Sequence, residues 1–381
     1  MAWFSEKKNQ NALLKGLASK DPKKRDQAAR AFLELGEEGT ATLVGALGSQ
    51  DEALRKIVSQ ILVRLSAKSI PALQGALKSA AFSTQEKVIS VLEKIQDPRS
   101  LALILEALKS DNYELQVRAA KSLGAMQYAE AIPHLLVALS DSDPDVRIAT
   151  VIALGKLRDP KTYLNIADLL DDAEINVRMA TAQTLGEIGA SETIPYLVDA
   201  LHDSFWWYGR SDAIKMLMKV IASFGKDALD PLIEAMGAKE PTARRYAIAL
   251  LRPLKEERII ESLEMAFYDT NYDVAESALV ALLEFGENIL PILDKALGSS
   301  NQWIREKSVW GLGEIGGEQA TTYLLELLED EADAVRKEAI GSLIKLKDPR
   351  ALPKLRALTL KRDEKEIAKL ARQAIAEIEA P

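Results

Sequence analysis

The sequence predicts an all-α protein: an α-solenoid of about twelve antiparallel helix pairs, with about 31 residues in each pair. The first observation is a large apolar residue, here called the anchor, that returns at a nearly constant interval, with one longer interval between Leu185 and Ile221. The second is helical spacing around each anchor, and the third is a set of turn residues at fixed places between the helical stretches. Such a period is typical of a repeat array, in which each unit buries its apolar face against its neighbours. The anchors are Phe32, Leu62, Leu92, Leu123, Leu154, Leu185, Ile221, Leu251, Leu282, Leu312, Leu343 and Ile375.

One copy, residues 131–160, shows how the helices of a repeat are predicted. Apolar residues at three- and four-residue steps indicate a first helix, namely Ile132, Leu135, Leu136 and Leu139. Asp143 can then cap a second helix, and Pro144 suits its first turn, where no N–H is needed. The second helix is indicated by Val146, Thr150, Ala153, Leu154 and Leu157, and it ends before Asp159 and Pro160.

Small residues recur at two places relative to the anchor. Directly after the anchor stand Gly124, Gly155, Gly186, Ala222 and Gly313. Because glycine inside a helix costs about 1 kcal/mol relative to alanine, we expect close approach of a neighbouring helix there. Four residues after the anchor, where a helix commonly ends in a left-handed residue, stand Gly36, Gly189, Gly225, Gly286 and Gly316.

An arginine occupies the place seven residues before the anchor in seven copies, at Arg25, Arg55, Arg147, Arg178, Arg244, Arg305 and Arg336. Acids often precede it by four or six residues, at Asp21, Asp141, Asp143, Asp172, Glu240 and Asp330. We interpret this pattern as a structural ladder that joins turn to helix and repeat to repeat. Gln85, Gln116, Ala275 and Ala368 should interrupt it.

Composition narrows the range of functions. The chain has no cysteine, which excludes disulfides, thiolate metal sites and cysteine nucleophiles. Its net charge is −8, and because residues 1–30 and 345–372 are basic, the rest is more acidic still, which disfavours nucleic acid as a partner. With no apolar run of about 18 residues and no secretory signal at the N-terminus, we expect no membrane span and a cytoplasmic location.

The string from Asp143 to Leu157 resembles the D-P-x-V-R-x-x-A-x-x-A-L-G-x-L signature of HEAT repeats, in the short form found in phycobilisome-lyase-like proteins. The match covers nearly the whole chain and is strongest around Val146, Val177, Ile304 and Val335. The resemblance implies a single HEAT-repeat domain over residues 1–381, wound as a right-handed superhelix with the second helices lining a concave groove. It also implies either an interaction module without chemistry or a bilin lyase.

Two motifs that suggest chemistry are explained by the repeat. Residues 311–316 match G-x-G-x-x-G, but Gly313 and Gly316 occupy the repeat's own small-residue positions at the end of a helix, not between a strand and a helix. The acids Glu329, Asp330, Glu331 and Asp333 lie at a turn, where they stabilise the next helix N-terminus. We therefore expect no metal, cofactor or catalytic site.

The lengthened repeat, within residues 190–225, contains the densest aromatic run, Phe205 to Tyr208. In one alignment Arg210 takes the arginine position and the second helix gains a turn; in the other, Ile214 takes it and the aromatics lie in an expanded loop. The first alignment is preferred here. Adjacent aromatics cannot all face one core, so this run either packs over a bend or contacts a ligand.

The predicted function is a non-enzymatic scaffold or adaptor that binds a protein partner, through a helix or loop of that partner in the concave groove of repeats 7 to 10. The alternative is a bilin lyase or chromophore chaperone. Aromatic residues, methionine and arginine are enriched at binding hot spots. The candidate partner-binding residues are Trp206, Trp207, Tyr208, Arg210, Met216, Arg245, Tyr246 and Trp310. We expect a monomer, in which Trp3 and Phe4 either cover the first repeat or anchor a partner.

Overall fold

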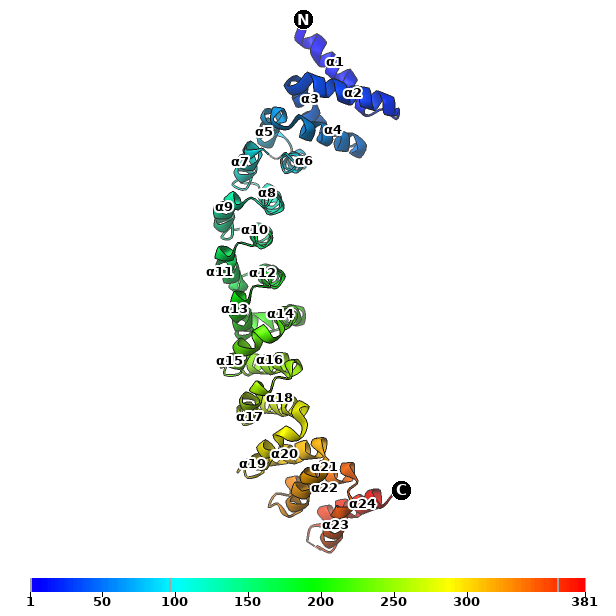
Figure 1. The fold of residues 1–381 in the computed structure, drawn as a ribbon, viewed down its shortest axis with the longest axis vertical. Helices are drawn as coiled ribbons and strands as arrows, with labels where there is room; N and C mark the ends of the chain where they lie inside the picture. Colours follow the sequence, from blue (N-terminus) through cyan, green and yellow to red (C-terminus); the bar gives the residue numbers. More distant parts are fainter. Residues whose placement is uncertain (1, 96, 362, 381) are drawn as a thin grey trace. The chain divides into compact units, whose positions relative to one another are not determined.

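The computed structural model describes residues 2–95, 97–361 and 363–380, with side chains from residue 9 onward. Over these residues it contains helices and no strand, and the helices alternate as first and second members of pairs (Figure 1). The first helices are α1 (Ala2–Leu17), α3 (Thr40–Ala46), α5 (Ile70–Ser79), α7 (Pro98–Ala107), α9 (Ile132–Ala138), α11 (Tyr163–Ala167), α13 (Ile194–Asp199), α15 (Leu229–Ala235), α17 (Ile260–Phe267), α19 (Leu290–Leu297), α21 (Gly317–Glu326) and α23 (Leu352–Leu358).

The second helices carry the anchors and are longer than most of the first helices. They are α2 (Pro22–Leu35), α4 (Glu52–Leu65), α6 (Phe82–Leu92), α8 (Tyr113–Met126), α10 (Pro144–Leu157), α12 (Ile175–Ile188), α14 (Ser211–Ser223), α16 (Pro241–Leu251), α18 (Tyr272–Leu282), α20 (Gln302–Ile315), α22 (Asp333–Leu346) and α24 (Lys365–Glu379). The all-α solenoid that the sequence predicts is therefore confirmed.

Short 3-10 helices form many of the connections. They are Gly36–Gly39, Ser66–Ser69, Ala129–Ala131, Pro160–Thr162, Asp168–Asp171, Ser191–Thr193, Ala200–His202, Ser204–Trp206, Gly225–Ala228, Arg252–Leu254, Glu257–Ile259, Leu283–Ile289, Leu327–Glu329 and Pro349–Ala351.

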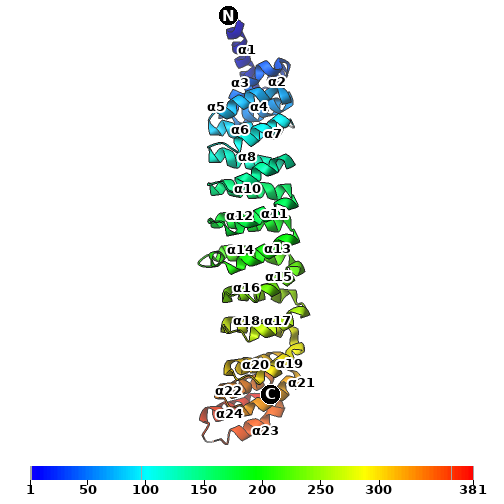
Figure 2. The ribbon, with the colours of Figure 1, turned by 90° about the vertical axis from the view of Figure 1, so that its left-hand side faces the viewer.

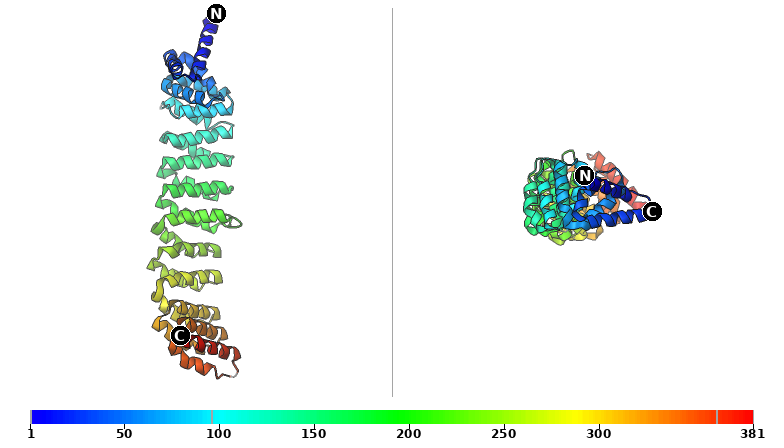
Figure 3. Two further views of the ribbon diagram at one scale, coloured as in Figure 1. Left: turned by 90° about the vertical axis from the view of Figure 1, so that its right-hand side faces the viewer. Right: turned by 90° about the horizontal axis from the view of Figure 1, so that it is seen from above.

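The chain divides into two compact units. Unit 1 comprises residues 1–197 and 210–220, and unit 2 comprises residues 198–209 and 221–381. Within unit 1, α8 packs on α10 and α10 on α12, while in unit 2 α16, α18, α20 and α22 pack in succession. Figures 2 and 3 show these second helices as successive layers within each unit.

The repeat at residues 131–160 folds as its sequence predicts. The Asp143 carboxylate accepts the backbone N–H groups of Asp145 and Val146, and α10 starts at Pro144. Inside the helix Val146, Thr150, Ala153 and Leu154 are buried. Local capping chemistry and apolar spacing thus agree on where this element begins and which face it buries.

The anchors form the core of the array. Eleven of the twelve have no exposed surface at all, from Phe32 to Leu343. The exception corrects the last position: Ile375 is half-exposed, whereas its neighbour Ala374, which stands at the regular interval after Leu343, is fully buried. The constant period, not side-chain size, decides which residue faces the core.

The small residues have the two roles that their positions predict. A Cβ on Gly124 would lie 2.7 Å from the Cα of Ala153, and one on Gly313 would lie 2.4 Å from the Ser342 hydroxyl. All five predicted helix-ending glycines have positive φ. At the same place in other copies the left-handed residue is Ser66, Gln127, Arg158, Lys255 or Lys347. The turn therefore belongs to the repeat geometry, and glycine only makes it easier.

The lengthened repeat follows the second of the two alignments, so the preferred one was wrong. The helix α14 has 13 residues, one fewer than α12, and gains no turn. The Ile214 N–H donates to the Arg210 carbonyl, as the Arg147 N–H donates to the carbonyl of the capping residue Asp143. Ile214 thus occupies the arginine position, and the extra residues form a loop.

Two further predictions concern the N-terminal aromatic residues and membrane-spanning helices. Trp3 and Phe4 lie in α1, but their side chains are outside those the structure describes. None of the described helices combines the length and apolar character that crossing a membrane requires.

Candidate partner-binding surface

The arginine position forms the ladder that the sequence predicts. Arg147 donates from Nε and Nη2 to the two carboxylate oxygens of Asp172, each at 2.8 Å, and from Nη1 to the carbonyl of Asp141 at 2.8 Å. Burial raises the pKa of Asp172, but Arg147 and the Glu174 N–H outweigh it and hold that pKa below its ordinary value. One guanidinium therefore joins its own turn to the next repeat.

The same arrangement recurs in unit 2. Arg244 bridges to Asp269 at 2.7 and 2.8 Å, and Arg305 reaches Asp330 at 3.2 Å. One predicted interruption was wrong: Gln116 donates to Asp141 at 2.9 Å and continues the ladder with a neutral donor. These arginines and the acids of the turns therefore have a structural role, because they join consecutive repeats.

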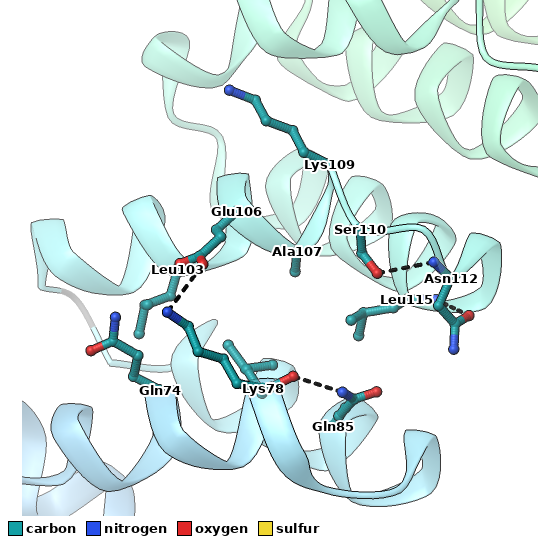
Figure 4. A pocket seen from close by; sticks show the side chains of 11 residues that line it. Gln74, Lys78, Gln85, Leu103, Glu106, Ala107, Lys109, Ser110, Asn112 and Leu115 are labelled. Atoms are coloured by element: carbon teal, nitrogen blue, oxygen red, sulfur yellow. Dashed lines mark hydrogen bonds and ion pairs between the residues drawn. The ribbon is translucent and has the colours of Figure 1, made fainter.

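At Gln85 the ladder is interrupted, as predicted. Its side-chain amide donates to the Leu77 carbonyl of its own repeat at 2.6 Å. The next turn carries Ser110, whose hydroxyl accepts the Asn112 N–H, in place of an aspartate. A cleft of about 390 Å³ opens here, lined by both residues and by the Lys78–Glu106 ion pair at 3.4 Å (Figure 4). A concave polar surface therefore lies where the ladder is interrupted.

The repeat structure explains both the G-x-G-x-x-G string at residues 311–316 and the acidic cluster at residues 329–333. Gly313 lies against Ser342, and Gly316 ends α20 with φ of 70°. Asp330 accepts from Arg305 and from the Ala332 N–H, and Asp333 pairs with Arg336. No group of three or more His, Cys, Asp or Glu residues that could hold a metal ion occurs in the described part of the chain.

The aromatic run is divided between core and surface. Trp206 is fully buried, so this residue packs in the core and is removed from the predicted contact surface. Trp207 is half-buried and donates from Nε1 to the Leu201 carbonyl at 3.3 Å. Tyr208 is 81% exposed and remains available to a partner.

The other predicted residues lie on separate elements. Arg210 is exposed just before α14, and Met216 is half-buried within it; both belong to unit 1. Arg245 and Tyr246 lie on α16 of unit 2, where Arg245 is 3.9 Å from the Asp273 carboxylate. Trp310 is half-buried on α20.

The structure gives Trp310 neighbours that the sequence prediction missed. The rings of Tyr272 and Trp303 lie 4.7 Å apart at an angle of 33°. The Lys307 ammonium is 5.6 Å from the Trp303 ring centre and 6.0 Å from that of Trp310. We call these four residues, Tyr272, Trp303, Lys307 and Trp310, the aromatic face. Cation–π contacts and ring packing hold its members together across α18 and α20.

Acids surround the aromatic face. Lys307 pairs with Glu276 at 2.7 Å, which offsets its charge. Glu306 and Glu314 lie one turn to either side of Trp310 on α20. Burial, and then the neighbouring carboxylates of Glu306 and Glu314, raise the pKa of Glu338 on α22 above its ordinary value. Because Glu314 also pairs with Lys345 at 2.6 Å, Glu306 is left as an acid beside Trp310 without an ion pair among the described residues.

A signal for the missed pair was present in the sequence. Tyr272 and Trp303 stand ten and nine residues before their anchors Leu282 and Leu312, so their places in consecutive repeats differ by only one residue. Equivalent residues of neighbouring units lie side by side in a solenoid. Neither residue is among the predicted contacts, and both lie at the start of their helices.

These repeats match a known family. The HEAT-repeat family model matches residues 70–139, 132–218 and 289–376, which is more than half of the chain. The chain belongs to the HEAT-repeat family. No curated protein matches it significantly.

Solved structures share the fold. The karyopherin Kap121p bound to the extreme C-terminus of the protein phosphatase Cdc14p is 14% identical, with 96% of this chain and 50% of that chain covered and a TM-score of 0.50. Kap121p bound to Nup53p is 14% identical, with 96% and 49% covered and a TM-score of 0.51. The chain thus spans about half the length of these karyopherin chains. At this identity the likeness is one of fold alone.

Proposed function

We propose that this HEAT-repeat chain is a non-enzymatic scaffold that binds a protein partner along its second helices, centred on the aromatic face of unit 2. The observation that carries the proposal is the packing of Tyr272 against Trp303, with Lys307 near the rings of both Trp303 and Trp310; Tyr272 is 55% exposed. Tyr and Trp offer large contact areas at a low cost in side-chain entropy, and they dominate binding hot spots.

The charges around this face specify the partner's chemistry. Lys307 is neutralised by Glu276 and Glu314 pairs with Lys345, whereas Glu306, one turn from Trp310, has no ion pair among the described residues. A partner segment would bury its apolar side chains against the rings and place a Lys or Arg near Glu306. The partner in this proposal is therefore a protein with a basic, amphipathic helix or loop.

The proposal extends to the repeat subtype and to the domain. The D-P-D-V-R string of α10 and the short repeat period support the phycobilisome-lyase-like form. The shared period supports one array over residues 1–381. The proposal also takes this array to be monomeric and cytoplasmic.

The test compares capture of proteins from a native lysate by the wild-type chain and by Trp303→Ala/Trp310→Ala, with identification by mass spectrometry. We expect the double variant to lose a partner that the wild type retains, at an unchanged helical circular dichroism. The matched control is Tyr196→Ala/Tyr268→Ala, which removes two exposed tyrosines from first helices and should retain that partner.

Two outcomes would contradict the proposal. Equal capture by wild type and double variant would remove the aromatic face from the binding site. A shifted visible absorption band on mixing the chain with a bilin would instead favour the chromophore-handling function that the family resemblance implies.

A further inference from the structure

Unit 1 contains a hollow on its second helices that differs in charge from the aromatic face. Its volume is about 520 Å³, and it is formed by α2, α4 and the end of α6. Three exposed cations line it, namely Lys56 and Arg64 of α4 and Lys94 after α6. No carboxylate is among its lining residues.

These three cations are unpaired, and three of the acids on or just after the same helices already pair with other cations. Among the described residues no ion pair or side-chain hydrogen bond involves Lys56, Arg64 or Lys94. Three of these acids are engaged as Asp26–Arg30 at 2.7 Å, Glu86–Lys87 at 2.9 Å and Glu93–Arg118 at 2.9 Å, whereas Glu34 and Glu52 form no ion pair among the described residues. No carboxylate lines the hollow or forms an ion pair with one of its three cations among the described residues.

The repeat register places like charges side by side. Arg64 and Lys94 each stand two residues after their anchors, so they are equivalent positions of consecutive repeats. At the same position in unit 2, Glu314 and Lys345 have opposite charges and pair at 2.6 Å. Neighbouring like charges repel one another, and a bound anion would relieve that repulsion.

The same position in α2 is occupied by an acid, Glu34, which does not line the hollow. Glu34 forms no ion pair with Arg64 among the described residues.

The floor between the cations is apolar. Ile57 and Val63 of α4 and Ala29 of α2 are each half-exposed and line the hollow. Lys56 and Arg64 are eight residues apart on one helix, which corresponds to about 12 Å along its axis. An extended peptide spans that distance in about four residues.

From this geometry we propose that the hollow binds an acidic peptide segment in which two carboxylates, about four residues apart, flank an apolar side chain. The carboxylates pair with Lys56 and Arg64, Lys94 adds a third cation, and the apolar side chain lies on Ile57 and Val63. The site involves neither unit 2 nor the aromatic face, so it goes beyond the proposed function.

Fluorescence anisotropy on the full chain tests the proposal, with a fluorescein-labelled peptide that contains Glu-Asp-Gly-Leu-Gly-Glu-Asp. We expect Lys56→Glu/Arg64→Glu/Lys94→Glu to weaken binding at least tenfold, and the corresponding triple glutamine variant to weaken it less. The control Lys20→Glu/Lys23→Glu/Lys24→Glu makes the same change in net charge at exposed residues outside the hollow and should bind normally. Trp303→Ala/Trp310→Ala should also bind normally, which separates this site from the proposed function.

Three results would overturn the proposal. One is no binding of the peptide at low salt. Another is equal weakening by the control triple variant, which would indicate a general charge effect. The third is binding of a single-stranded oligonucleotide of equal charge as tightly as the peptide, which would assign the hollow to polyanions.

Discussion

At the residue scale, a single Cβ decides how closely consecutive second helices pack. Gly124 and Gly75 are both helical glycines of unit 1 with different surroundings. A Cβ on Gly124 would meet the Ala153 backbone, whereas one on Gly75 would meet nothing within 4 Å. Glycine is therefore required at the first position and only tolerated at the second.

We expect Gly124→Ala to destabilise the protein by about 1–3 kcal/mol, because the helix backbones α8 and α10 must move apart. Gly75→Ala should stabilise it by about 0.5–1 kcal/mol through the lower entropy of the unfolded chain. Thermal unfolding followed by circular dichroism measures both. A Gly124→Ala variant as stable as wild type would show that the close approach is not a constraint.

At the scale of the element, the ladder shows how one arginine position connects repeats. Arg147 and Asp172 are 25 residues apart, as are Gln85 and Ser110. Only the first pair is an ion pair. Gln85 and Ser110 both line the cleft, at a place where the ladder is interrupted.

The double variant Gln85→Arg/Ser110→Asp should restore the missing arginine–aspartate ion pair of the ladder. We expect it to stabilise the protein by about 1 kcal/mol, because the new pair would be partly buried and bidentate. Each single variant should give less than half of that gain, because an unpaired charge is introduced into the cleft. Urea denaturation of all four members of the cycle gives the coupling energy. Purely additive effects would mean that the two side chains do not meet.

At the scale of the whole molecule, each repeat contacts only its neighbours, so stability should vary along the chain. We expect Gly124→Ala to speed amide hydrogen exchange in α8 and α10, and to leave exchange in α18, α20 and α22 of unit 2 unchanged. Hydrogen exchange with mass spectrometry measures this helix by helix. A uniform increase in both units would show that the array unfolds as one cooperative body.

The sequence by itself determined the period, the anchors, the left-handed helix ends and most of the ladder. Each of these depends on contacts within one repeat or on a contact that recurs in several repeats, such as Arg147 with Asp172 and Arg244 with Asp269. Such features appear in the sequence as repeated residues at fixed spacing. Of the candidate surface, the sequence indicated Trp310, Arg245 and Tyr246.

Only the tertiary structure decided the exceptions. It placed Trp206 in the core and Tyr208 at the surface, put Ile214 in the arginine position, and paired Gln116 with Asp141. It also joined Tyr272 and Trp303 into the aromatic face and left the cations of the α4 hollow unpaired. The physical reason is that each of these outcomes depends on which side chains of neighbouring repeats meet once, at a single place, and a contact that does not recur leaves no periodic signal in the sequence.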